Sequence, residues 1–339
     1  MKRLHILLML MLSLTFVYQA NAQDDLDQFL EQSAEDGEKL IGAYIAPAIK
    51  AFSLGMNQGW YNTAKPHKVA GVDLTFTGSL MKVPSSEQLF DVNALGLSEL
   101  TLVDANGNPR SNGNISTILG PDVPAIFSLS STVNDGTIDQ SDDVEVPGGL
   151  ELGEDVKLLE NKMPAAMLQL GFGLPKGTDI KFRFVPKVDV GDDGKFNLFG
   201  IGVMHDVKQY IPGIKNLPFD LSAFVGYTKM KLDVAFDPGQ NGLFEVSSTT
   251  IQGVASKKLS VVTFYGGLGY NIAKSNLAML GTYDIGGSNV IDPVDLSYAA
   301  SGFRGSVGMR LKLAVFTFHA DYTLQKYSAL TAGFGISVR

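Results

Sequence analysis

Long segments in which apolar and polar residues alternate constrain this chain more than any other feature of its sequence. The pattern is clearest near the C-terminus, where three such segments follow one another at 303–313, 316–325 and 330–338. Earlier segments at 180–184 and 261–272 repeat with the same period of two residues. Successive side chains of a β-strand point to opposite faces of the sheet, so this period indicates strands with one apolar and one polar face.

The length of these segments narrows the choice of fold. The longer ones cover about 10 to 13 residues, whereas strands in globular proteins average about 5 to 6. A tilted strand needs about 9 to 11 residues to cross a bilayer, and alternating segments of this length are typical of outer-membrane barrels. A soluble β-sandwich also alternates and is the alternative fold.

The pattern predicts an all-β chain, an antiparallel transmembrane β-barrel of about 12 strands (roughly 10–14) with an N-terminal amphipathic helical segment. The barrel is expected at residues 71–339, beginning with a strand at 72–83 and ending in the periplasm. The two weakest predicted strands lie near 97–103 and 121–130. The expected connections are 175–177, 207–217, 273–275 and Ala314 on the periplasmic side, and 131–164, 191–194, 232–258 and 286–301 on the outer side.

Residues 1–22 have the features of a secretory signal peptide. Lys2 and Arg3 precede a largely apolar run, and Ala20-Asn21-Ala22 is a small-x-small cleavage site. The apolar run, at about 14 residues, is shorter than the roughly 20 residues of a membrane-spanning helix. Export, cleavage after Ala22 and a location in the bacterial outer membrane are therefore expected.

The composition excludes several classes of function. The chain has no cysteine, which excludes a disulfide scaffold, a thiolate metal site and a cysteine nucleophile. Its formal net charge is -8 and its pI is about 5.0, which argues against binding to nucleic acid, whose phosphates need a basic surface.

Residues 23–70 are expected to form a helical plug or lid. Beyond Asp24 and Asp25 the apolar residues recur at helical spacing, with a break or kink expected at Gly37 and Pro47. The apolar stripe that must be buried consists of Leu40, Ile41, Tyr44, Ile45, Ile49 and Phe52. Two interpretations stay open: the helix packs on an ordinary core, or it closes the barrel while its acidic start meets basic residues of the lumen.

Polar residues on the inward faces of the predicted strands are the candidate solute contacts. They are Lys181, Arg183, Arg304, Arg310, Lys312, His319 and Asp321. The bases among them favour anions if solutes pass through the barrel. In a filled lumen they are expected instead to form salt bridges with Asp73 and Asp321.

Motifs for catalysis, including HExxH, GxSxG and the Walker A sequence, do not occur. We therefore expect no enzymatic activity, no cofactor and no metal site. His319 and Asp321 are better explained by a polar lumen network than by a catalytic pair with Ser306. His67, between Lys65 and Lys68, is interpreted as structural rather than as a metal ligand.

Trp60 and Tyr61 form the only adjacent Trp–Tyr pair of the chain. As interface anchors they would lie at the inner surface of the membrane, as aromatic girdles do. Ordinary packing in a core beneath the barrel explains them equally well.

The stretch LGMNQGWYNTAKPHK at 54–68 carries a resemblance, together with Ala46-Pro47 before it and GVDLT at 71–75 after it. It resembles a family of uncharacterised outer-membrane β-barrel proteins from Bacteroidetes. The resemblance runs through the mature chain and implies a barrel without an established activity. A helical segment before a mid-sized barrel is also distantly similar to the architecture of long-chain fatty-acid transporters.

Three functions fit these observations. The first is a passive channel or transporter for small solutes, either apolar or anionic, with the helix as its plug. The second is a structural or surface-interaction barrel with a filled lumen. The third is a soluble periplasmic ligand-binding β-protein. For a barrel in the membrane, the expected partners are outer-membrane lipid and the barrel-assembly machinery, and no particular solute is indicated.

Overall fold

The computed structural model describes residues 34–129, 131–132, 138–139, 143–150, 157–191, 193–214, 216–285 and 288–338. The expected signal peptide at 1–22 and the beginning of the 23–70 segment lie outside this part of the chain. Among the described residues, no helix has both the length and the apolar character to cross a membrane.

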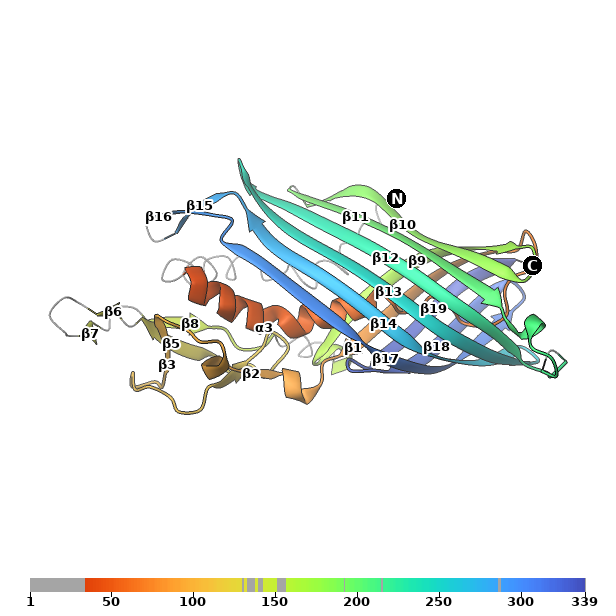
Figure 1. Cartoon of the computed structure of the whole chain (residues 1–339), viewed down its shortest axis with the longest axis horizontal. Helices are drawn as coiled ribbons and strands as arrows, with labels where there is room; N and C mark the ends of the chain where they lie inside the picture. The colour runs from red at the N-terminus through yellow and green to blue at the C-terminus, as the bar shows by residue number, and fades with distance from the viewer. Residues whose placement is uncertain are drawn as a thin grey trace.

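Ten antiparallel strands close into a barrel (Figure 1), within the range that the sequence predicts. Around the wall they are β1 (Val72–Lys82), β19 (Ala329–Val338), β18 (Phe316–Leu324), β17 (Val294–Leu313), β14 (Val262–Leu280), β13 (Gln240–Leu259), β12 (Asp220–Asp237), β11 (Gly194–Asp206), β10 (Thr178–Val190) and β9 (Lys162–Leu174). Every neighbouring pair is antiparallel, and the ring closes where β1 pairs with both β19 and β9.

The alternation of the sequence matches the two faces of the wall. On β18 the side chains alternate strictly between exposed and buried, with Phe316 and Phe318 outward and Thr317 and His319 inward. The interior is therefore mainly polar and the exterior mainly apolar, the reverse of a soluble barrel. This arrangement confirms the predicted fold class.

The two ends of the barrel differ. We call the end with Val72 and Val338 the near mouth, and the opposite end the far mouth. Near-mouth hairpins turn at Lys176, Ser260 and Ala314, non-glycine residues with positive φ, as the favoured hairpin turns require. The far mouth carries the longest connection, the insert at 83–161, and the β14–β17 connection at 281–293, while the near mouth also carries the β11–β12 connection at 207–219.

Three of the expected connections differ from the structure. The outer loop expected at 286–301 ends before Val294, because residues 294–301 are paired strand residues of β17. Residues 273–275 lie inside β14, where the inward Ala273 and Ser275 flank the outward Lys274. The turn comes at Ser260 instead, so the outer loop expected at 232–258 consists mostly of paired strand residues of β12 and β13. Small and polar residues at 273–275 look like a turn locally, but pairing with β13 and β17 on both sides holds them in the sheet.

The weak strands expected near 97–103 and 121–130 exist but do not belong to the barrel. β3 (Leu100–Val103) and β5 (Ala125–Leu129) pair with each other, and β5 also pairs with β8 (Asp143–Val146). With four to five residues, these strands are too short to cross a bilayer. This explains why the barrel has ten strands rather than twelve.

The other short elements lie in connections of the barrel. They are the pairs β2 (Leu89–Asp91) with β4 (Asn114–Ser116), β6 (Ser131–Thr132) with β7 (Ile138–Asp139) and β15 (Thr282–Ile285) with β16 (Ser288–Ile291), and the 3-10 helices η1 (Ser85–Glu87), η2 (Val92–Ala94), η3 (Lys157–Leu159) and η4 (Lys208–Tyr210).

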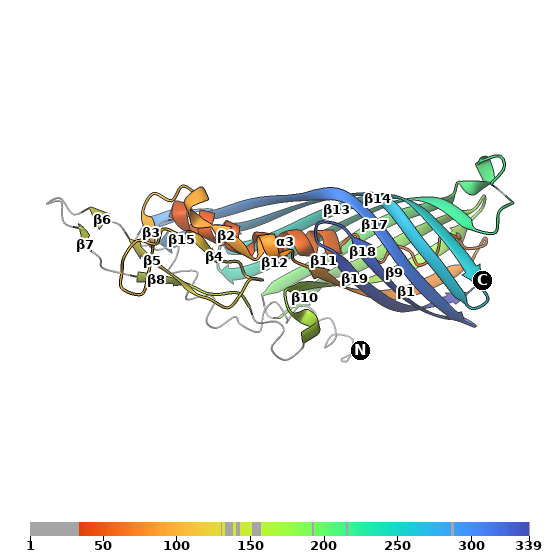
Figure 2. The ribbon, with the colours of Figure 1, turned by 90° about the horizontal axis from the view of Figure 1, so that it is seen from below.

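Helix α3 (Ala34–Gly55) runs along the concave side of the wall from the far mouth inward (Figures 1 and 2). It is one continuous helix with Pro47 inside, so the expected division at Gly37 or Pro47 does not occur. Strands β12, β13, β14 and β17 have 18 to 20 residues and extend past their neighbours at the far mouth. The first half of α3 packs against this protruding wall at β14 and β17.

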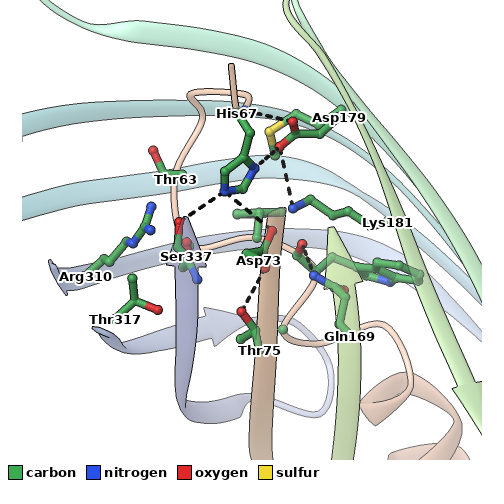
Figure 3. A pocket seen from close by; sticks show the side chains of 15 residues that line it. Thr63, His67, Asp73, Thr75, Gln169, Asp179, Lys181, Arg310, Thr317 and Ser337 are labelled. Atoms are coloured by element: carbon green, nitrogen blue, oxygen red, sulfur yellow. Dashed lines mark hydrogen bonds and ion pairs between the residues drawn. The ribbon is translucent and has the colours of Figure 1, made fainter. Parts of the chain in front are cut away.

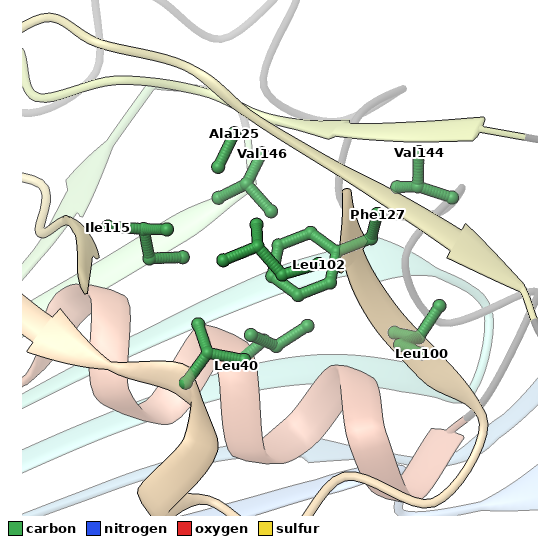
Figure 4. Close-up of a cluster of buried hydrophobic side chains, with 9 residues drawn as sticks. Leu40, Leu100, Leu102, Ile115, Ala125, Phe127, Val144 and Val146 are labelled. Carbon is green, nitrogen blue, oxygen red and sulfur yellow. The ribbon is translucent and has the colours of Figure 1, made fainter. Parts of the chain in front are cut away.

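The insert covers the opposite side of the helix. Leu40 of α3 lies in an apolar core that the insert strands complete (Figure 4). The other members of this core are Val92, Leu100, Leu102, Ile115, Ala125, Phe127, Val144 and Val146. Ile41 and Ile45 face the protruding wall, where they pack with Val294 and Leu296. The apolar stripe of the helix is thus buried on two sides.

Candidate functional site

The chain passes through the barrel between α3 and β1. Residues 56–70, which we call the threaded segment, leave the helix inside the lumen and reach the near mouth, where β1 begins. Met56, Trp60 and Ala64 are buried along this path. Bonds to the wall hold it, with Asn57 Nδ2 donating to Thr249 O over 3.1 Å and the Ala64 backbone N–H to Ser256 Oγ over 3.0 Å.

Two buried arginines of the wall bind the beginning of the threaded segment. Arg183 donates from Nη1 to Met56 O over 2.7 Å and from Nη2 to Gln58 O over 2.6 Å. Its guanidinium also lies 3.6 Å from the ring centroid of Trp60. Arg304 donates to Asn57 O over 3.0 Å and to Gln58 Oε1 over 2.9 Å.

The two arginines lie beside the C-terminal end of helix α3. The last carbonyls of an α-helix have no helical donor and carry partial negative charge, so cations are stabilised near that end. Met56 and Asn57 come directly after the last residue of α3, Gly55. The last carbonyls of α3 itself already accept bonds, from the backbone N–H groups of residues 56–58 and from Ser248 Oγ. Arg183 and Arg304 instead bind the carbonyls that follow the helix, at residues 56–58, and we call the pair the arginine clamp.

The acidic start of the helix does not meet these bases, contrary to the sequence-based expectation. Asp36 lies at the far mouth and accepts backbone N–H bonds from Glu99 and Leu100 of the insert at 2.7 and 3.1 Å. Glu38 accepts from the backbone N–H of Asp295 over 2.8 Å. The helix enters from the far mouth because its C-terminal end must lead through the lumen to β1.

A second polar cluster lies at the near mouth (Figure 3). His67 donates its backbone N–H to Asp179 Oδ1 over 2.7 Å, and its Nδ1 lies 2.9 Å from Asp179 Oδ2. Its Nε2 lies 3.5 Å from Asp73 and 3.3 Å from Ser337 Oγ. His67 thus fixes the end of the threaded segment to three strands, which accords with the structural role predicted for it.

The other expected lumen residues lie on the inward face. Lys181 lies 3.9 Å from Asp179, and Lys312 donates to Ser337 O over 3.1 Å. Arg310 and His319 are direct partners across β17 and β18 and are 8% and 5% exposed. Asp321 accepts a bond from Tyr265 Oη over 2.9 Å.

The salt bridges expected with Asp73 and Asp321 differ from those found. Among the described residues, one of these lumen bases forms an ion pair, Lys181 with Asp179, a residue that the sequence analysis did not single out. Asp179 shares the inward face of β10 with Lys181 and Arg183, so the alternation could have identified it. Gln58 and Gln169, which complete the contacts of the arginine clamp, carry no comparable signal.

Trp60 and Tyr61 are not interface anchors. Trp60 is 1% exposed and packs inside the barrel against Phe224, with ring centroids 5.5 Å apart. Tyr61 donates to Gln252 Oε1 and contacts Ser306 Oγ at 3.0 Å. A Cβ at Gly202 or Gly226 would lie within 3 Å of the Trp60 ring, so these wall glycines make room for it. The sequence places these two glycines on the inward faces of their strands, and this was the signal for a buried tryptophan that sequence reasoning missed.

Very little space remains beside the threaded segment. The cavity at the near-mouth cluster and the one beside Arg304 and Asp321 each have a volume of about 10 Å³, roughly what one water molecule needs. No group of three or more metal-binding side chains occurs among the described residues. The described lumen is therefore filled by the protein itself.

Comparisons with known proteins give only general likenesses of structure. Ail of Yersinia pestis has 11% identity and a TM-score of 0.26, over 79% of this chain and 98% of Ail. The translocator domain of the autotransporter NalP from Neisseria meningitidis has 9% identity and a TM-score of 0.31, over 86% and 93%. The toluene transporter TodX of P. putida has 7% identity and a TM-score of 0.22, over 79% and 67%. At these scores the likenesses carry no argument about function.

Comparison of sequences identifies the family of the chain, which the structural likenesses do not. No curated protein sequence matches the chain. A family profile, in contrast, matches residues 1–338, which is almost the full length. The chain therefore belongs to the family of unknown function DUF6588.

Proposed function

We propose that the protein is an outer-membrane barrel that is closed by its own threaded segment and presents the insert at the cell surface. It is then a structural or surface-interaction barrel, the second of the functions that the sequence allows. The single observation that carries the proposal is the arginine clamp, because it fixes the chain inside the lumen.

An apolar belt on the outer wall supports the membrane location. On β17 the outward residues from Phe303 to Leu313 are apolar or glycine, and Phe303 is 84% exposed. Ten residue steps at about 3.4 Å, tilted by about 40°, give a height of about 26 Å, close to the roughly 25 Å of barrel belts. Beyond the belt, paired outward positions turn polar at Lys229, Ser247 and Lys274. The sequence resemblance to outer-membrane proteins of Bacteroidetes agrees with this location.

The connections at the two mouths indicate how the barrel is oriented in the membrane. In barrels of this class, periplasmic turns are short and extracellular loops are longer. Both ends of the barrel chain and three tight turns lie at the near mouth, and the longest connection, the insert, lies at the far mouth. With the near mouth in the periplasm, the insert faces the outside, and lipid and the barrel-assembly machinery are the expected partners.

Conductance in planar bilayers tests the closed lumen. The full-length protein should give no steady current, because the threaded segment fills the lumen. The double variant Arg183→Ala/Arg304→Ala should give frequent openings, since the carbonyls after α3 lose their donors. The control Lys229→Ala/Lys231→Ala removes two bases from the outer face of β12 and should stay closed. A steady current from the unmodified protein contradicts the proposal and favours a passive channel.

A gated path for small anions is a second candidate function. It is favoured by Lys181 and Arg310, which line the near-mouth cavity, and by Lys312, which bonds Ser337 beside it. In that case the current of the double variant should be anion-selective. The reversal potential in a potassium chloride gradient measures this selectivity, and cation selectivity rules the candidate out.

A further inference from the structure

Lysines mark the far-mouth edge of the apolar belt. Along each of the strands β1, β9, β10, β12 and β14, taken from the near mouth, the first charged residue on the outward face is a lysine, and another lysine lies in the turn between β18 and β19. We call these residues the lysine ring: Lys82, Lys162, Lys187, Lys229, Lys274 and Lys326. At the near-mouth edge, the outward positions of the described strands carry one lysine, Lys257. The two edges of the belt therefore differ in charge.

Two members of the lysine ring face each other. Lys82 of β1 and Lys162 of β9 are direct partners in the antiparallel pairing, which places their Cβ atoms about 5 Å apart on the outer face. Among the described residues neither lysine forms an ion pair, whereas Lys326 is paired with Glu87. Lys162 Nζ donates to the backbone O of Glu160 over 3.2 Å, and an ammonium has further N–H donors to offer. Because like charges directly opposite each other destabilise a sheet, the pair is a favourable position for an anion from outside the chain.

The outer wall beside the Lys82–Lys162 pair is apolar on its near-mouth side. Leu80 and Pro164 are the next outward residues and are again direct partners, and Leu168 further along β9 is 50% exposed. Lysine buries its long stem along such apolar surface while its ammonium stays at the level of the lipid head groups. An amphiphile with its anionic group at the two lysines therefore has its apolar chains against the belt. This arrangement fits a lipid rather than a free ion.

We propose that the Lys82–Lys162 pair binds the phosphate group of an anionic lipid in the leaflet at the far mouth. The inference rests on the membrane location proposed above. Each ammonium donates charge-assisted hydrogen bonds to phosphate oxygens, and two lysines match the charge of about -2 that a phosphate monoester carries near neutral pH. The other members of the lysine ring lie at the level of the same head groups. With the far mouth outside, the lipid belongs to the outer leaflet.

Quenching of tryptophan fluorescence by lipids with brominated acyl chains tests this proposal, because bromine quenches at short range. Leu80→Trp places a probe beside the lysine pair, and Phe316→Trp places one at the near-mouth edge of the belt. Trp60, the single tryptophan of the chain, stays in place inside the lumen, and the unmodified protein measures its contribution. Each protein is folded into phosphatidylcholine vesicles in which a small fraction of the lipid is brominated, either phosphatidic acid or phosphatidylcholine.

Brominated phosphatidic acid should quench the probe at position 80 more than the same fraction of brominated phosphatidylcholine does, whereas position 316 should show no such preference. Lys82→Gln/Lys162→Gln should lower the preference roughly fivefold for each lysine removed. Lys82→Arg/Lys162→Arg keeps both charges and should retain the preference. The matched control Lys195→Gln/Lys231→Gln removes two outward lysines that are not part of the ring and should leave the preference unchanged.

Equal quenching of position 80 by the two brominated lipids overturns the proposal, and so does a preference that survives Lys82→Gln/Lys162→Gln. If excess inorganic phosphate in solution abolishes the preference, the pair binds free phosphate instead of a lipid, which also overturns the proposal. Absence of quenching at both positions by either lipid instead overturns the membrane location, so the two failures are distinguishable.

Discussion

Arg183 owes its role to its planar group of donors as much as to its charge. It bonds two carbonyls of the threaded segment, donates from Nε to Gln169 Oε1 over 3.2 Å and covers the face of Trp60. A lysine ammonium is a point charge that cannot reproduce this fork and stacking geometry. Arg183 is fully buried, and among the described residues its bonding partners are the carbonyls after α3 and the Gln169 side chain rather than a carboxylate.

Arg183→Met should destabilise the folded barrel by about 1–3 kcal/mol, because it leaves buried carbonyls without donors. Arg183→Lys should recover only part of this loss. Urea unfolding in lipid vesicles measures the effect, with Lys195→Met on the outer face of β11 as the control. Equal stability of Arg183→Met and the control contradicts the clamp.

A single substitution at Val307 tests whether the outer face of the barrel contacts lipid. It is 66% exposed near the middle of the apolar belt on β17, whereas Ser297 is an outward residue of the same strand beyond the belt. Val307→Arg should cost about 2–4 kcal/mol, the range for Arg at the midplane of a bilayer, and Ser297→Arg should cost close to nothing. The same unfolding measurement applies, and similar costs at both positions contradict a membrane location.

At the scale of elements, the insert and α3 depend on each other. The insert strands are short, and their apolar core is completed by Leu40 of the helix. Asp36 adds a polar connection through the backbone N–H groups of residues 98–100. Burial raises the pKa of Asp36, but these N–H donors and Lys39 outweigh that effect, so its pKa lies below that of a free aspartate.

This pKa shift predicts a pH dependence. A carboxyl whose pKa is lowered by folding contributes stability above the pKa of the unfolded chain, about 3.9 for Asp, and loses it as the pH falls through the folded-state pKa. The insert should therefore stay docked at neutral pH and loosen in strong acid, below about pH 4. Asp36→Asn should loosen it at all pH values. Hydrogen exchange at the amides of residues 98–100 measures docking, and unchanged protection in Asp36→Asn contradicts the connection.

At the scale of the whole molecule, a single continuous stretch of chain, helix α3 followed by the threaded segment, fills most of the interior of the barrel. The helix enters at the far mouth, the arginine clamp binds the residues that follow it, and the threaded segment leaves at the near mouth beside Asp179. Because the segment is covalently continuous with β1, the plug belongs to the barrel rather than to a separate domain. The insert then closes over the helix from outside (Figure 2).

Proteolysis on intact cells tests the orientation of the molecule. A protease site placed after Asn106, in an exposed turn of the insert, should be cut on intact cells. The same site placed after Lys176, in a near-mouth turn, should be cut only after the outer membrane is permeabilised. The reverse pattern inverts the orientation and moves the insert to the periplasm.

The sequence by itself determined the faces of the strands. The inward position of Lys181, Arg183, Arg304, Arg310, Lys312, His319 and Asp321 follows from a period of two, which is a property of the local backbone. The amphipathic helix over Leu40–Phe52 and the turns at 175–177 and Ala314 follow from local patterns in the same way.

Only the tertiary structure decided how these pieces are joined. Residues 273–275 read locally as a turn, and β14 continues through them because strands on both sides pair with it. The direction of α3, the exclusion of β3 and β5 from the barrel and the burial of Trp60 likewise depend on contacts between residues far apart in the chain. Alternation specifies which side of a strand faces inward, but the free energy that selects strand partners and fills the lumen comes from long-range packing.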